Sequence, residues 1–423
     1  MAPLSESPSG SLRSAVREDH ERLDTSDYAV AIERGTLPIA RYASYLRAVY
    51  VLHDGLEQLV ELSGSSVLRA AFAAGPTQRE RLERDLAHLN VDKHGVDVAA
   101  LHALVLVQRL RLAAGPSHWL GAIYVLEGSQ LGGLVQARAL ASRPELQHGG
   151  LAYLSGSGPD TRAALRDLFA LLDEQLRDPA ALAAAIAGAK EMFAGFEAIL
   201  SAVMAGGERP AEALNADAGA HPLPRDAREV SAALIAGERT RRDVSYYEAR
   251  YGERGARFTR SDSAWLVTLT HLPRPEALRQ VRWLARVLAA RGMPRLLLER
   301  HLEQLHSQLC AELPENRADY AVLLEAAASL AQERRAHLSD AQLEQLVGEL
   351  ENSYRLQPGG TPPLPLREAG FLLLAAVLDE ACGVPHAVES LCRWLTDTSR
   401  ASQGFRVAVE HTLRSARDAV AGA

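Results

Sequence analysis

The chain has few of the residues that build β-sheets or cross-linked folds. Only 5% of its 423 residues are aromatic, three are cysteines, and runs that alternate β-branched and aromatic residues are nearly absent. Ala, Leu, Arg and Glu dominate instead, and these residues favour helices. We therefore expect an all-α protein, and its length favours two or three domains over one.

Further absences narrow the class. The cysteines Cys310, Cys382 and Cys392 are odd in number and all late in the chain, which fits a reducing compartment without a disulfide framework. The apolar run FLLLAAVL at 371–378 is too short to cross a bilayer, and the first residues lack the apolar core of a signal peptide. The net charge of −7 argues against a general nucleic-acid surface. We expect a cytoplasmic protein with no nucleic-acid or membrane partner.

Segments rich in glycine and proline divide the chain. They predict a flexible N-terminus over 1–10, a helical domain over 11–205, a linker over 206–225 and a second helical domain over 226–423. The Gly/Pro segment 357–365 marks a candidate boundary inside the second domain. In the first domain, apolar periodicity predicts helices over residues 11–33, 37–63, 66–89, 97–113, 117–142, 160–176 and 180–204.

Three glycines interrupt a segment that otherwise has the pattern of one helix. Residues 118–133 have the sequence HWLGAIYVLEGSQLGG, which contains Gly128, Gly132 and Gly133. Each glycine inside a helix costs about 0.5–1 kcal/mol relative to alanine. Gly128 and Gly132 share one helix face. Either another helix packs very close to this bare backbone, or a flat ligand lies on it.

The first predicted helix carries a histidine with a carboxylate one turn away. His20 lies in LRSAVREDHERLD, and Asp24 at i+4 can accept a hydrogen bond from its imidazole. Metal-bound histidines usually have such a partner. Arg13 lies two turns earlier on roughly the same side, where it can pair with an acidic ligand edge. A surface histidine without a ligand is the alternative that the helix alone leaves open.

Several runs together resemble the heme oxygenase family. They are HERLD, then GTLPIARYASYLRAVYVLHDGLE at 35–57, WLGAIYVLEGSQLGG, and KEMFAGFEAIL at 190–200. The resemblance covers about residues 11–204 and is greatest to the bacterial branch that accompanies bacteriophytochromes. It implies a helical domain with heme between two helices, and oxidative cleavage of heme to biliverdin, Fe²⁺ and CO. Heme would be both cofactor and substrate, and O₂ the oxidant.

The resemblance also implies roles for particular residues. His20 would be the proximal iron ligand, and the glycine-bearing helix would be the distal helix, kinked over the porphyrin. Gly128, Gly132 and Gly133 would let the backbone approach the iron-bound oxygen. Ser129 stands where many animal-type heme oxygenases carry an Asp that organises proton delivery, and the bacteriophytochrome-linked branch has a hydroxyl residue there.

The resemblance places further residues around the ligand. Arg13 matches a basic position that contacts a heme propionate, and Arg166 is a weaker candidate for the same role. Phe193, with Met192 and Phe196, would line the pocket wall, although ordinary core packing is the more common reason for such residues. Ser129 would deliver protons through water, with Gln130 as a second option.

Partners follow from what the chain does not contain. No dinucleotide-binding GxGxxG loop follows a strand, so electrons would come from an external reductase or ferredoxin. The resemblance names a bacteriophytochrome as a candidate consumer of the bilin. A heme- or bilin-binding sensor without turnover, signalling through the C-terminal half, is the alternative function.

Two other enzyme classes share this helical scaffold. A thiaminase-like enzyme resembles it in fold but uses a cysteine nucleophile, and residues 1–309 contain no cysteine. A di-iron oxidase needs a set of carboxylates and Glu-x-x-His pairs on facing helices. The pairs Asp85/His88 and His53/Glu57 are interpreted more simply as solvated helix faces.

Residues 226–423 carry no motif that names a function. The arginine-rich segment 246–269 either cradles an anion or forms a surface loop between helices. Cys382, His386 and Cys392 offer three zinc ligands without a clear fourth. We expect a helical bundle used for dimerisation, regulation or partner docking.

Overall fold

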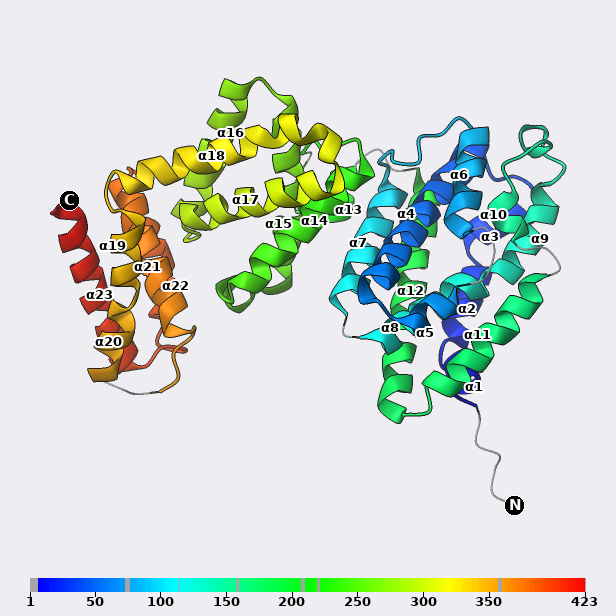
Figure 1. Cartoon of the computed structure of the whole chain (residues 1–423), viewed down its shortest axis with the longest axis horizontal. Coiled ribbons are helices and arrows are strands. Elements are labelled where there is room, and N and C mark those ends of the chain that lie inside the picture. The colour runs from blue at the N-terminus through cyan, green and yellow to red at the C-terminus, as the bar shows by residue number, and fades with distance from the viewer. Residues whose placement is uncertain are drawn as a thin grey trace, which may run out of the picture. The chain divides into compact units, whose positions relative to one another are not determined.

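The computed structural model describes residues 7–72, 77–113, 115–156, 160–206, 210–217, 219, 221–356 and 360–422. These residues form helices and no named β-strand, which confirms the all-α class (Figure 1). They group into two compact units, one of residues 1–220 with 225–227, and one of 221–224 with 228–423. Parts of the expected flexible start (1–6), linker (207–209, 218, 220) and sub-boundary (357–359) lie outside the described residues.

The first unit is a helical bundle built around three long helices. Helix α12 packs against α8, α7 and α4, and α4 packs against α7 and α6. Its named helices are α1 (Pro8–Ala15), α2 (Arg17–Asp24), α3 (Asp27–Glu33), α4 (Ile39–Ser63), α5 (Ser66–Ala71), α6 (Gln78–His88), α7 (Val98–Leu112), α8 (Pro116–Gly128), α9 (Gln130–Leu140), α10 (Ala152–Ser155), α11 (Thr161–Gln175), α12 (Pro179–Ala205) and α13 (Pro210–Leu214).

The N-terminal helix differs from the single element expected over 11–33. It begins earlier, at Pro8, because the Ser7 hydroxyl caps it by accepting from the Gly10 amide. It then divides into α1, α2 and α3. Val16, at φ −114° and ψ 12°, leaves the helical region between α1 and α2, and Ser26 caps α3 anew.

The segment expected as a linker also contains structure. After α12 ends at Gly206, whose positive φ of 63° suits a helix C-cap, the chain forms the short helix α13. Ala211 and Leu214 are buried, and α13 packs against α7. Two apolar side chains on one turn therefore hold this part of the segment to the first unit.

The second unit is a separate array of helices with its own apolar core. Its helices are α14 (Ala227–Asp243), α15 (Tyr246–Thr268), α16 (Arg274–Ala290), α17 (Arg295–Glu312), α18 (Arg317–Arg335), α19 (Asp340–Val347), α20 (Glu349–Leu356), α21 (Leu366–Ala381), α22 (Ala387–Leu395) and α23 (Gln403–Ala421). The run FLLLAAVL lies in α21, where Leu372, Leu373 and Leu374 are almost fully buried. That run is therefore core, as its short length indicated.

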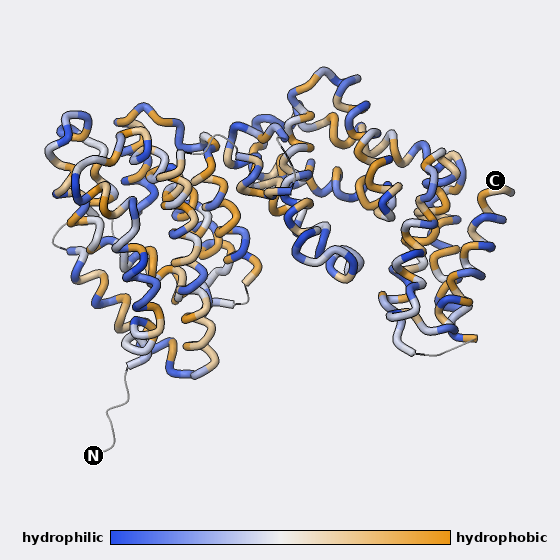
Figure 2. The backbone as a smooth tube through the Cα atoms, turned by 180° about the vertical axis from the view of Figure 1, so that it is seen from behind, coloured by the Kyte–Doolittle hydropathy of each residue, from blue (hydrophilic) through white to orange (hydrophobic). Residues whose placement is uncertain are grey.

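In most helices of both units, hydrophobic residues are interspersed with hydrophilic ones, as in amphipathic helices with one apolar face (Figure 2). Among the described helices, none combines the length and apolar character needed to cross a membrane. The arginine-rich segment 246–269 is the helix α15 rather than a surface loop. Its one irregular residue is Gly252, at φ 50° and ψ −145°.

Candidate functional site

His20 lies on a helix that buries none of its side chains. The side chains of His20 and Asp24 are 63% and 68% exposed, and Nδ1 lies 2.9 Å from Oδ2 of Asp24. An ionised carboxylate can only accept, so in the neutral form of the ring Nδ1 carries the proton and Nε2 keeps the lone pair. The structure thus brings together the histidine and carboxylate that their spacing predicted, in the tautomer that leaves Nε2 open for a metal.

Helix α2 is held together by charge rather than by core burial. Glu18 and Asp19 lie in its first turn and Arg22 in its last, which complements the helix dipole. Arg22 also pairs with Asp19 across one turn. These local interactions keep α2 helical while its surface, including His20, stays accessible.

Phe193 on α12 is the residue that contacts His20. The two ring centroids lie 6.1 Å apart in an edge-on arrangement, and Phe193 is 6% exposed. Met192 and Phe196 are buried in the core of the unit. Core packing therefore accounts for Met192 and Phe196, and Phe193 is a core residue that in addition contacts the imidazole ring.

The glycine-bearing segment forms two helices with a break between them. Helix α8 ends at Gly128 and α9 begins at Gln130. At the junction, the Ser129 hydroxyl donates to the Leu126 carbonyl at 2.7 Å. Gly/Ser pairs are a known cause of sharp helix kinks, because the hydroxyl competes for a backbone carbonyl. The single helix expected over 117–142 is therefore divided at Gly128 and Ser129.

The glycines in this segment face different surroundings. Among the residues that the structure describes, a Cβ placed on Gly128 or on Gly132 would meet nothing within 4 Å. A Cβ on Gly133 would lie 3.0 Å from the Leu154 carbonyl oxygen on α10. Gly133 thus differs from the expectation, because close packing against α10 accounts for it. Gly128 and Gly132 have bare backbone that no neighbouring helix requires.

The glycines that do pack helix on helix lie elsewhere on α8 and α12. A Cβ on Gly121 would lie 1.8 Å from the Ala185 carbonyl oxygen, and one on Gly188 would lie 1.9 Å from that of His118. Neither distance is possible for a real side chain. Sequence reasoning missed this pair, although the small-residue run AAAIAGA in α12 was a signal for close helix contact.

An exposed apolar stripe runs along the same face as the open glycines. Leu131 is 42% exposed and Val135 is 66% exposed. With Gly128 and Gly132 they occupy positions i, i+3, i+4 and i+7, which share one side of a helix. A flat apolar molecule would find both close backbone and apolar side chains there. The spacing was present in the sequence, but only the exposure shows that the stripe is not core.

Ser129 adjoins a buried cluster of tyrosines. Tyr153 neighbours both Ser129 and Tyr45, and each of them influences the pKa of its phenol. Burial raises the pKa of Tyr153 well above its ordinary value and that of Tyr45 to about 12. Asp85 fixes Tyr153 by accepting from its amide at 2.8 Å. Sequence reasoning did not identify these tyrosines as neighbours of Ser129.

Gln130 points into the protein and is paired with Glu127. Both are buried, and the Gln130 amide donates to the Glu127 carboxyl group. Burial raises the pKa of Glu127 to about 7, while the charge of Arg81 opposes the shift. Because its amide is engaged with Glu127, Gln130 is a weaker candidate for proton delivery than Ser129.

The two expected propionate contacts lie on the surface of neighbouring helices. Arg13 is exposed on α1, close enough to Tyr124 on α8 to counteract the rise in the Tyr124 pKa that burial causes. Arg166 is exposed on α11, which packs against both α1 and α8. Both cations are thus accessible, and neither has moved into the core.

Of the two pairs interpreted as solvated helix faces, one residue each, His53 and Asp85, is in fact internal, whereas Glu57 is half-buried and His88 is exposed. His53 is 1% exposed, burial lowers its pKa to about 3, and neither ring nitrogen has a hydrogen-bond partner. Asp85 is also 1% exposed and accepts from the amides of Ala152 and Tyr153. The solvated interpretation was wrong because α4 and α6 pack together and turn these residues inward. In the described ranges, no cluster of three or more His, Cys, Asp or Glu residues is arranged to hold a metal.

Comparison with known proteins places this site in a family. The family model described as heme oxygenase matches residues 7–202. The heme oxygenase of Xanthomonas campestris pv. campestris (strain 8004) is 35% identical over 173 residues, which are 41% of this chain and 96% of the relative. The chain therefore belongs to the heme oxygenase family. The matched residues include His20 and the glycines of α8 and α9.

Proposed function

We propose that the first unit cleaves heme oxidatively to biliverdin, Fe²⁺ and CO, with O₂ and electrons from an external reductase or ferredoxin. The observation that carries this proposal is the bare backbone at Gly128 and Gly132, where an added Cβ meets nothing within 4 Å. The helix cost of about 1–2 kcal/mol for the two glycines calls for a functional reason. A flat ligand lying on the main chain supplies one.

The residues present fit heme as the substrate. Nε2 of His20 offers a neutral nitrogen lone pair, the form in which imidazole binds iron. Asp24 holds the ring through Nδ1, and Phe193 lies against the ring edge. Bound heme would supply the iron that binds and activates O₂. Asp24 would raise the basicity of the imidazole, as such carboxylate partners do.

The opposite face would control access to the reacting centre. Gly128 and Gly132 would let α8 and α9 approach the macrocycle, and Leu131 and Val135 would cover it and exclude water. Ser129 would hold a water molecule through its hydroxyl. Its hydrogen bond to the Leu126 carbonyl would fix the orientation of that hydroxyl.

The rim of the site would bind the charged edge of heme. Arg13 and Arg166 are exposed cations on α1 and α11, suited to carboxylate groups. Biliverdin released there is the chromophore precursor that a bacteriophytochrome would take up, which makes such a photoreceptor the candidate partner. The fate of the product is a separate question from turnover and needs a separate test.

The test uses the full chain with hemin, a reducing system and O₂. We expect a histidine-ligated heme spectrum, its loss on reduction in air, and the appearance of biliverdin and CO. Stable heme binding without product would contradict the proposal and favour a heme sensor that signals through the second unit. No heme binding would contradict both functions.

A further inference from the structure

The second unit contains a hollow of about 380 Å³ that the heme chemistry does not use. Helices α15, α16 and α17 supply most of its lining, with Thr240 contributed by α14. Small-molecule sites in proteins have volumes of about 300–1,000 Å³, so the hollow is large enough for a small ligand. The arginine-rich segment whose function the sequence left open forms one wall.

Helix α15 shapes the hollow by bending at Gly252. The residue has φ 50° and ψ −145°, a backbone conformation that is essentially restricted to glycine. Tyr247 and Tyr251 line the hollow from before the bend, and Phe258 lines it from after the bend. Three aromatic rings from one helix thereby face the same space.

The remaining walls are largely apolar. They comprise Leu266, Leu284, Leu288, Met293, Pro294 and Leu298. Aliphatic and aromatic linings of this kind favour an apolar ligand body, because its removal from water is the main gain on binding.

The inner end of the hollow is polar but uncharged. The Thr240 hydroxyl donates to the Ala236 carbonyl at 3.0 Å, so it accepts from Nδ1 of His301, 2.9 Å away. The Ser263 hydroxyl then donates to Nε2 at 3.0 Å. Burial lowers the pKa of His301 to about 4, so the imidazole is neutral at pH 7. This end therefore offers no charge to a ligand.

Positive charge gathers on the accessible side of the hollow. Arg291 and Arg254 line the hollow and are exposed, and Arg250 is half-buried beside them. Arg250 is fixed by donating to the backbone carbonyls of Arg291 and Ser390 at 3.1 and 3.2 Å. Within the described part of the chain, Asp262 is the one acidic residue of the lining, against three arginines.

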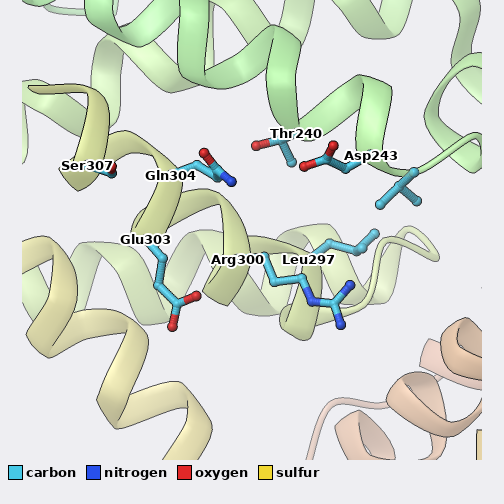
Figure 3. Close-up of a pocket in the computed structure, with 8 residues that line it drawn as sticks. Thr240, Asp243, Leu297, Arg300, Glu303, Gln304 and Ser307 are labelled. Atoms are coloured by element: carbon cyan, nitrogen blue, oxygen red, sulfur yellow. The ribbon is translucent and has the colours of Figure 1, made fainter. Parts of the chain in front are cut away.

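A neighbouring hollow of about 300 Å³ shows the contrast (Figure 3). Thr240 and Asp243 reach it from α14, and the other labelled residues lie along α17. Its charged residues are Asp243, Arg300 and Glu303, and Arg300 stacks on the Phe371 ring at 4.2 Å. Charges of both signs give this second hollow no preference for an anion.

We propose that the larger hollow binds an apolar molecule that carries a carboxylate. The apolar body lies against the leucines and aromatic rings, and the carboxylate meets Arg291 at the exposed end. Arg250 reinforces the positive potential from a fixed position. Guanidinium groups pair with carboxylates through parallel hydrogen bonds, which gives the selectivity for this group.

The test measures binding to the full chain by isothermal titration with three matched probes. Naphthoate carries the carboxylate, naphthamide has the same shape without charge, and naphthyl phosphate carries a different anion. We expect naphthoate to bind at least about tenfold more tightly than naphthamide, the size of one charge-assisted hydrogen bond. Equal binding of naphthoate and naphthamide, or no binding of either, would overturn the proposal. Tighter binding of naphthyl phosphate would overturn the preference for a carboxylate and indicate a ligand with a phosphate group.

Variants locate the binding in this hollow. Arg291→Gln should remove most of the preference for naphthoate over naphthamide, and Asp262→Asn should strengthen naphthoate binding by removing the opposing charge. Arg279→Gln is the matched control, since Arg279 is 71% exposed on α16 and outside the lining. It should change nothing. If Arg291→Gln and Arg279→Gln behave alike while both keep wild-type helicity, the ligand binds elsewhere.

A cavity-filling variant gives an independent check. Leu288→Trp should abolish binding of both naphthoate and naphthamide by occupying the apolar space, with heme binding by the first unit unchanged. Retained affinity in a folded Leu288→Trp protein would contradict the proposed site. If this variant does not fold, the Arg291→Gln and Asp262→Asn pair still decides the question, because neither substitution adds bulk to the apolar walls.

Discussion

The two units present histidines in opposite settings. His20 in the first unit is 63% exposed and paired with the Asp24 carboxylate, whereas His301 in the second is 7% exposed and paired with two hydroxyls. A carboxylate partner makes the free ring nitrogen a better metal ligand. Hydroxyl partners and burial instead use both ring nitrogens and keep the ring neutral. The partner and the exposure, rather than the residue type, decide which histidine can hold iron.

The glycines of the first unit form a second contrast. Gly121 and Gly188 are pressed against backbone atoms of the facing helix, but Gly128 and Gly132 have open space where a Cβ would stand. The first pair is required by packing, and the second is not.

Replacing His20 should have the largest effect on function. In His20→Ala we expect loss of the histidine-ligated heme spectrum and of nearly all turnover, with no loss of helicity, because alanine is the better helix former. His301→Ala should do the reverse: it leaves turnover intact but lowers the free energy of unfolding by about 1–3 kcal/mol, since two buried hydroxyls lose their partner. Absorption spectra and thermal unfolding of both variants check this. Normal turnover in His20→Ala would contradict the assignment of His20 as the iron ligand.

The glycine comparison predicts a strong separation of activity from stability. Gly132→Leu should block turnover while iron ligation by His20 persists, with little change in Tm. Gly121→Ala should lower the free energy of unfolding by about 3 kcal/mol or more, because its Cβ collides with a backbone carbonyl. Any activity that remains in the folded fraction of Gly121→Ala should be normal. If Gly132→Leu changes only Tm, the open face is not the ligand face.

Asp24 should matter less than His20. Asp24→Ala is expected to lower heme affinity or turnover about 10- to 100-fold, the range for losing the residue that orients a ligand. Asp24→Asn is the sharper control, since it keeps the shape but favours the wrong tautomer. If Asp24→Ala lowers turnover equally at all pH values and leaves the heme spectrum unshifted, Asp24 does not orient the His20 ring.

The buried carboxyl of Glu127 predicts a pH dependence of stability. Burial raises its pKa to about 7 in the folded state, above its unfolded value of about 4.3. A raised pKa of this kind stabilises the fold below the unfolded value, and that stability is lost as the pH rises toward 7. We expect the free energy of unfolding to fall between about pH 4 and pH 7, by on the order of 4 kcal/mol at most. Glu127→Gln should flatten this profile. An unchanged slope in urea titrations would show that Glu127 is not the cause.

Removing the second unit should have the smallest effect on turnover. We propose that a chain ending at Asp217, which keeps α13, retains heme cleavage within about twofold, because the site residues and their contacts lie in the first unit. A chain ending at Ala205 loses the buried Ala211 and Leu214 and should be less stable. Loss of heme binding in the longer fragment would show that the second unit completes the site.

Local features of the fold and site were predictable from the sequence alone. Helix propensity and apolar spacing identified an all-α chain. The i+4 spacing predicted the His20–Asp24 contact, and the cost of glycine in a helix drew attention to α8 and α9. Such inferences succeed because helix geometry relates residues within a few positions of each other. The runs quoted above also resembled the heme oxygenase family, because such a resemblance is carried by short stretches of sequence.

Long-range packing decided the rest. Nothing within a few residues of Gly133 shows that the Leu154 carbonyl lies against it, or that Gly121 and Gly188 meet backbone across two helices. His53 and Asp85 have polar neighbours in sequence but face the interior once α4 and α6 pack. The hollow of the second unit likewise depends on residues of α14, α15, α16 and α17 that are far apart in the sequence. Burial depends on which elements meet in space, and spacing along one helix does not contain that information.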